Sequence, residues 1–135
     1  MAYFDHAALF THLLRGGRAD QFLGSVTLSG VTGLRWLELR PALKGIELWV
    51  FDVQDVGAPG HTDLYAFPVL NEEIMPFAVA TFATSREVER YAEQQYAASP
   101  LRWAPPPQAR EDYAEWLKAN GSPRRALPSA DFDEI

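Results

Sequence analysis

The stretch "QFLGSVTLSGVTGLRWLELRPALKGIELWVFDVQDV", from Gln21 to Val56, decides the fold class. Apolar and polar residues alternate along three runs within it, which is typical of strands with one buried face. The segments "SGVTG" and "KG" between these runs are typical of turns. Because such connections are too short for the crossover that parallel neighbours need, we expect antiparallel hairpins.

Two later runs extend this pattern. "DLYAFPVL", from Asp63 to Leu70, and "FAVATFA", from Phe77 to Ala83, are each predicted to be a strand. Together with the three runs before them, they predict one antiparallel meander of five strands. The rings expected on its helix-facing side are those of Phe22, Trp49, Phe51 and Phe82. The other side is expected to remain open to a partner, and it carries Leu37, Leu39, Leu48 and Val50.

Helices are predicted on both sides of the strand region in the sequence. Asp5 is a good N-cap for a helix over residues 5–15, and Thr84 with Glu87 has the spacing of a capping box. A last helix is predicted from Gln108 to Asn120. The sequence therefore predicts an α+β fold in which the N-terminal helix and two C-terminal helices pack on one face of the sheet.

The chain of 135 residues has the length of one ordinary domain. We expect residues 1–121 to form a single α+β domain. Residues 122–135, "SPRRALPSADFDEI", show no periodicity and are predicted to be an irregular C-terminal tail.

Charge and composition narrow the classes of partner. The chain has 12 Lys+Arg against 18 Asp+Glu and a formal net charge of -6, which disfavours binding to nucleic acid or to an anionic membrane. It has no cysteine, which excludes thiol nucleophiles and cysteine-based metal centres. No apolar run approaches the about 20 residues that a membrane-spanning helix needs, and the first residues do not resemble a secretory signal. We therefore expect a cytoplasmic protein, of bacterial origin by its composition, with no cofactor and no metal.

One loop has the residue types of a catalytic site. Asp55, His61 and Asp63 surround a Gly-Ala-Pro-Gly turn. Two carboxylates and an imidazole could bind a divalent metal there, or the imidazole could act as a general base oriented by a carboxylate. Their spacing matches no known motif, and such a turn is equally typical of an exposed connection between strands. A small metal-assisted or general-base hydrolase is therefore kept as an alternative.

Other residues are candidates for binding a protein. Trp36 and Trp103 could be exposed aromatic anchors of an interface. Acidic residues on loops could form a negative rim that accelerates association with a basic partner. The rim residues are Asp55, Asp63, Glu72 and Glu73.

Three classes of function follow from these features. The favoured one is a non-catalytic, acidic protein-binding module that neutralises a basic bacterial toxin or enzyme by occlusion, as immunity proteins do. The second is the small hydrolase that uses Asp55, His61 and Asp63. The third is a homo-oligomeric structural or regulatory subunit that pairs the open face of its sheet with a second copy.

Overall fold

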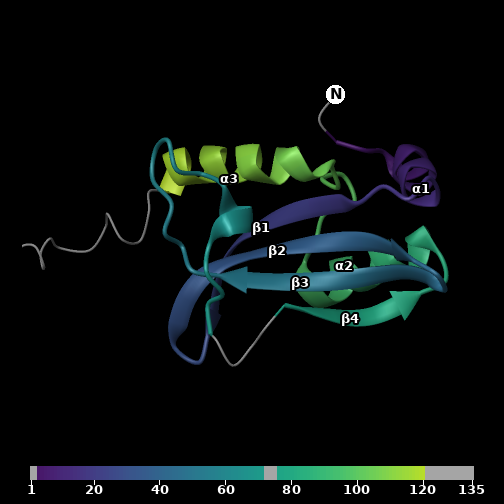
Figure 1. The fold of residues 1–135 in the computed structure, drawn as a ribbon, viewed down its shortest axis with the longest axis horizontal. Coiled ribbons are helices and arrows are strands. Elements are labelled where there is room, and N and C mark those ends of the chain that lie inside the picture. The colour runs from purple at the N-terminus through teal and green to yellow at the C-terminus, as the bar shows by residue number, and fades with distance from the viewer. Residues whose placement is uncertain (1–2, 72–75, 121–135) are drawn as a thin grey trace, which may run out of the picture.

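The computed structural model describes residues 3–71 and 76–120. It is an α+β fold with one antiparallel sheet, as the sequence predicts (Figure 1). Its elements in chain order are α1 (His6–Leu14), β1 (Ala19–Leu28), β2 (Val31–Ala42), β3 (Gly45–Val53), the 3₁₀ helix η1 (Leu64–Ala66), β4 (Phe77–Phe82), α2 (Ser85–Tyr96) and α3 (Pro106–Asn120). Residues 122–135, the predicted tail, lie outside the described residues.

The sheet has four strands in the order β1-β2-β3-β4, so the prediction of five strands is wrong. The segment 63–70, predicted as a strand, forms η1 and makes only an isolated bridge between Val69 and Val53. Leu64 and Phe67 are both buried. Side chains three residues apart share one side of a helical turn, whereas they point to opposite sides of a strand. Burying both side chains on one side therefore favours the turn.

The predicted starts of the first two helices are confirmed. The Asp5 side chain accepts a hydrogen bond from the Ala8 backbone N–H at 2.7 Å. Thr84 and Glu87 exchange two hydrogen bonds, at 3.1 and 3.2 Å, and complete the capping box. α3 begins at Pro106, two residues before the predicted start, and proline is tolerated there because the first turn of a helix has no partner for a backbone donor.

Both faces of the sheet are covered. One core cluster joins Leu37 and Leu39 of β2 to buried side chains of α1 and α2, and a second joins Leu34 and Trp36 to buried side chains of η1 and α3. Because successive residues of a strand point to opposite faces, the two clusters lie on opposite faces. The packing of all three helices on one face is thus not confirmed. The face that was expected to stay open, with Leu37, Leu39, Leu48 and Val50, is buried under α1 and α2.

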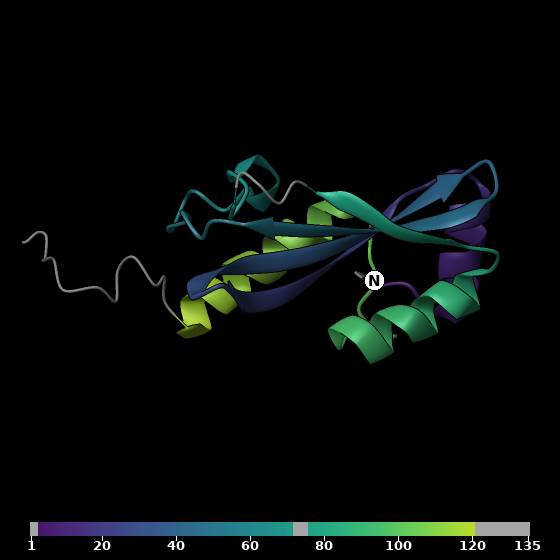
Figure 2. The ribbon, with the colours of Figure 1, turned by 90° about the horizontal axis from the view of Figure 1, so that it is seen from below.

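The elements are distributed toward two ends of the molecule. α1, the turn between β2 and β3 and the start of α2 lie at one end in both views (Figures 1 and 2). The loop after β3 and the last turn of α3 lie at the opposite end. Candidate sites at the two ends are therefore separated by the length of the sheet.

Candidate functional site

The loop with the predicted catalytic residues is tied along β3 by backbone hydrogen bonds. The Gln54 N–H donates to the Pro68 carbonyl at 2.8 Å, and the Leu70 N–H donates to the Asp52 carbonyl at 2.9 Å. Ala58 and His61 exchange two backbone hydrogen bonds, at 3.1 and 2.8 Å, which close the tip of the loop. The tip is thus a defined turn over α3.

Asp55 is a buried anchor of this loop. The Tyr113 hydroxyl donates to its Oδ1 atom at 2.6 Å, which joins the loop to α3. Gly57 lies so close that a Cβ atom there would be 2.0 Å from the Tyr113 hydroxyl oxygen. The loop and the helix are therefore in direct contact at this point.

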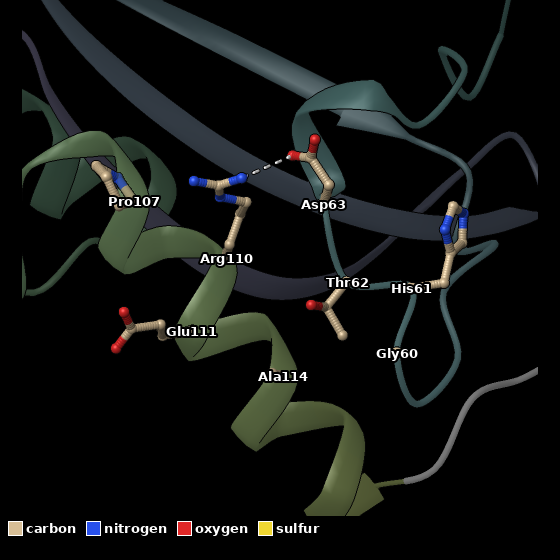
Figure 3. Close-up of a pocket in the computed structure, with 8 residues that line it drawn as sticks. All are labelled: Gly60, His61, Thr62, Asp63, Pro107, Arg110, Glu111 and Ala114. Atoms are coloured by element: carbon tan, nitrogen blue, oxygen red, sulfur yellow. Dashed lines mark ion pairs between the residues drawn. The ribbon is translucent and has the colours of Figure 1, made fainter.

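His61 and Asp63 line a cleft of about 400 Å³ between the loop and α3, and Asp55 does not (Figure 3). Asp63 points toward Arg110, at 3.9 Å between charged atoms, while the His61 ring lies apart from this pair and packs near Phe67, with 5.6 Å between ring centroids. Among the described residues, no three His, Asp or Glu side chains are grouped so that they could hold a metal ion. The three residues of the hydrolase alternative are thus not brought together.

The two tryptophans predicted as exposed anchors are buried, and this expectation is corrected. Trp36 is 5% exposed and stacks on Phe51 with 4.0 Å between ring centroids. Trp103 is 0% exposed and belongs to the core cluster beneath α1 and α2. Each ring fills a core because both faces of the sheet are covered. Neither side chain is available to a partner in this conformation.

The predicted negative rim has little support in the described part of the chain. Asp55 is buried, and Asp63 is exposed but lies beside Arg110. Glu72 and Glu73 lie outside the described residues. In the described part of the chain, four carboxyl groups counted in the formal net charge are buried, and they belong to Asp20, Glu38, Asp55 and Glu89.

Sequence reasoning missed a buried polar cluster at the edge of the sheet. Asp20 of β1 and Glu38 of β2 are cross-strand partners, and each is 1% exposed. The Arg40 Nε atom donates to Glu38 Oε2 at 2.9 Å, and the Arg18 Nε atom lies 3.2 Å from the same oxygen. The Tyr65 hydroxyl lies 2.8 Å from Asp20 Oδ2.

A signal for this cluster is present in the strand pattern. Glu38 has the same strand parity as Trp36, and Asp20 the same parity as Phe22, so each carboxyl group occupies a core-facing position of an alternating run. A charged residue at such a position is almost never fully buried without a partner. The pattern could therefore have indicated a paired acid.

Burial raises the pKa of Asp20 to about 7, although the hydrogen bond from Tyr65 and the nearby Arg18 and Arg40 act in the opposite direction. The negative charge of Glu38 adds to the increase. Burial, followed by the charge of Asp20, also raises the pKa of Tyr65. The cluster borders a cavity of about 400 Å³ lined by Arg18, Glu38, Arg40 and Tyr65, among others. A carboxyl group that titrates near neutrality beside a cavity is a candidate functional group.

An apolar groove of about 310 Å³ lies at the other end of the sheet. It is formed by α1, by the turn between β2 and β3, and by the first residues of α2. Phe10 and Leu14 line it and are 49% and 75% exposed, and Leu43, in the turn beside it, is fully exposed. The residues adjacent to the groove in sequence include the exposed Arg15 and Lys44. Large apolar side chains gathered in this way are typical of an interaction surface.

No family model matches the chain, and no curated protein or solved structure matches it either. Among the described residues, no helix has the length and apolar character needed to cross a membrane. The function must therefore be argued from the groove, the cleft and the buried cluster.

Proposed function

We propose that the protein is a non-catalytic binding module that binds another protein in the groove between α1 and the β2–β3 turn. The observation that carries this proposal is the exposure of Phe10, Leu14 and Leu43 at one end of the molecule. A water-exposed apolar surface is stabilised when a partner covers it, at about 25 cal/mol for each Å² buried. An aromatic or aliphatic anchor that becomes buried in a pocket is the usual centre of a binding interface.

The partner is a protein with an apolar segment that fits the groove. The net charge of -6 favours a partner that is basic overall, since opposite net charges raise the rate of association. Neutralisation of a basic bacterial toxin or enzyme is one form of this function, in which the module covers the active surface of its partner. The proposed contact is apolar, and the charge contributes to steering rather than to the contact itself.

The test compares two leucines with nearly equal exposure. Leu14 is 75% exposed in the groove and Leu101 is 73% exposed outside it. We expect Leu14→Glu to weaken binding to the purified protein encoded beside this gene by at least about tenfold, and Leu101→Glu to leave it unchanged. Binding is measured by titration calorimetry, and circular dichroism checks that both variants keep the fold. An equal effect of both substitutions, or no binding by the parent protein, contradicts the proposal.

Self-association is a second candidate, and the edge strand β4 favours it. β4 pairs with β3 on one side and is the last strand of the sheet in the described residues. Its sequence, "FAVATF", has no charge and no proline, and such edges are ready to pair with another strand. We expect Thr81→Lys to lower the oligomeric mass in size-exclusion chromatography with light scattering if copies pair through β4. A monomeric parent protein excludes this candidate.

A further inference from the structure

Three segments that are distant in sequence meet at Asp20. The Asp20 N–H donates to the Ala104 carbonyl at 2.8 Å, and the Ala104 N–H donates to the Asp20 carbonyl at 3.1 Å. The Tyr65 side chain of η1 contacts both Asp20 Oδ2 and the carbonyl oxygen of Pro106, the first residue of α3. Asp20 therefore joins β1, η1 and the start of α3.

The hydrogen bonds at Tyr65 require a second hydrogen. Its hydroxyl lies between two groups that accept hydrogen bonds, but it carries one hydrogen. If this hydrogen is donated to the Pro106 carbonyl, the contact with Asp20 is a hydrogen bond only when the Asp20 carboxyl group is protonated and donates to the Tyr65 oxygen. A neutral carboxyl group thus satisfies both contacts, and a carboxylate satisfies one of them.

The surroundings of Asp20 agree with a neutral carboxyl group. Its Oδ1 atom is buried and has no hydrogen-bond partner among the described residues, and the nearest cationic atom to it is Arg18 Nε at 3.8 Å, beyond hydrogen-bond distance. An unpartnered carboxylate oxygen costs far more to bury than an unpartnered neutral carbonyl oxygen. The charged groups that face Asp20 are Glu38 on the opposite strand and Arg18 and Arg40, and both arginines lie closest to Glu38. The Glu38 carboxyl group is therefore the member of the pair that both arginines contact most closely.

We propose that Asp20 is a proton-binding site that fastens η1 and the start of α3 to β1. In the protonated state, Asp20 donates to Tyr65 and Tyr65 donates to the Pro106 carbonyl. When the proton leaves through the adjacent cavity to water, the Tyr65 hydrogen turns to the Asp20 carboxylate. The Pro106 carbonyl then loses its donor from η1, and the junction at residues 104–106 loosens. The elevated pKa of Asp20 supports a transition near neutrality.

The test follows the carboxyl group and the junction together in the full chain. We expect the ¹³C resonance of the Asp20 carboxyl group to titrate near pH 7, and the amide protection of Ala104 and of the first turn of α3 to fall over the same pH range. Protection is corrected for the intrinsic pH dependence of exchange. Asp20→Asn is expected to remove this response, because an amide can donate to Tyr65 at every pH.

Tyr65→Phe separates the proposed relay from simple ionisation. In this variant Asp20 remains buried and still titrates, but protection at the start of α3 no longer follows its titration. Asp63→Asn, which changes an exposed carboxylate next to α3, is the matched control and is expected to leave the response intact. Titration of Asp20 near pH 4 in the parent protein, or an unchanged response in Tyr65→Phe, would overturn the proposal. If Asp20→Asn does not fold, the titration of Asp20 in the parent protein still tests the proposal.

Discussion

Asp20 and Asp55 each bury a carboxyl group with one oxygen that has no hydrogen-bond partner among the described residues. Each carboxyl group is also hydrogen-bonded to a tyrosine hydroxyl from a distant segment. The tyrosine is Tyr65 for Asp20 and Tyr113 for Asp55. The first contact joins η1 to β1, and the second joins the loop after β3 to α3. Asp55, expected at a catalytic loop, is thus a structural link, and the residue with the raised pKa is one that the sequence motifs did not indicate.

Asp20→Asn tests the pH dependence of stability. The pKa of Asp20 rises from an ordinary value of 3.8 to about 7 in the folded protein. Between these values the folded state holds a proton that the unfolded state has lost, so the free energy of unfolding falls as the pH rises from 4 to 7. The variant has no titrating group at this position, so its free energy of unfolding does not fall in this way. We expect its free energy of unfolding at pH 8 to be higher than that of the parent protein by more than about 1 kcal/mol.

Denaturant unfolding of both proteins at pH 4 and pH 8 provides the measurement. At pH 4 the difference between them should be much smaller, because Asp20 is then neutral in the folded parent protein. A difference that does not change between pH 4 and pH 8 would show that Asp20 does not titrate as its burial requires.

At the scale of elements, the sequence predicts best where local chemistry decides. The N-caps at Asp5 and Thr84 were predictable because a side-chain acceptor three residues before a backbone donor is a local signal of a helix start. The strands β1, β2 and β3 were predictable from alternation. The segment 63–70 was not, since its alternation fits a strand equally well, and the structure instead buries Leu64 and Phe67 through a turn.

Thr84→Ala tests the capping box at the start of α2. The substitution removes the hydroxyl acceptor of the Glu87 N–H, and we expect a loss of about 1 kcal/mol in the free energy of unfolding. Glu87→Gln retains a group that can accept from the Thr84 N–H and is expected to cost much less. Thermal and denaturant unfolding measure both, and equal losses would mean that the box does not depend on the threonine hydroxyl.

At the scale of the whole molecule, the covering of both sheet faces is the main departure from expectation. β2 carries large apolar side chains at both parities, Leu34 and Trp36 on one side and Leu37 and Leu39 on the other. Such a strand is typical of a sheet buried on both faces, so a signal was present in "LRWLELR". Which helix covers which face depends on contacts between distant segments, and local periodicity does not contain that information.

Leucine substitutions on the two faces test this architecture. We expect Leu34→Ala and Leu37→Ala each to lower the free energy of unfolding by about 2–5 kcal/mol, because both side chains are completely buried. Leu101→Ala, at an exposed position, should change it by less than about 0.5 kcal/mol. Chemical denaturation gives all three values. A small effect of Leu37→Ala would mean that its face is open.

The last turn of α3 ends at Asn120, at the end of the sheet opposite the apolar groove (Figure 1). The chain has no cysteine, so a single Asn120→Cys substitution would accept a thiol-reactive dye or a surface linker at one defined position. A molecule immobilised in this way presents Phe10, Leu14 and Leu43 to solution. Its geometry is therefore suited to a sensor in which capture of a partner does not compete with attachment.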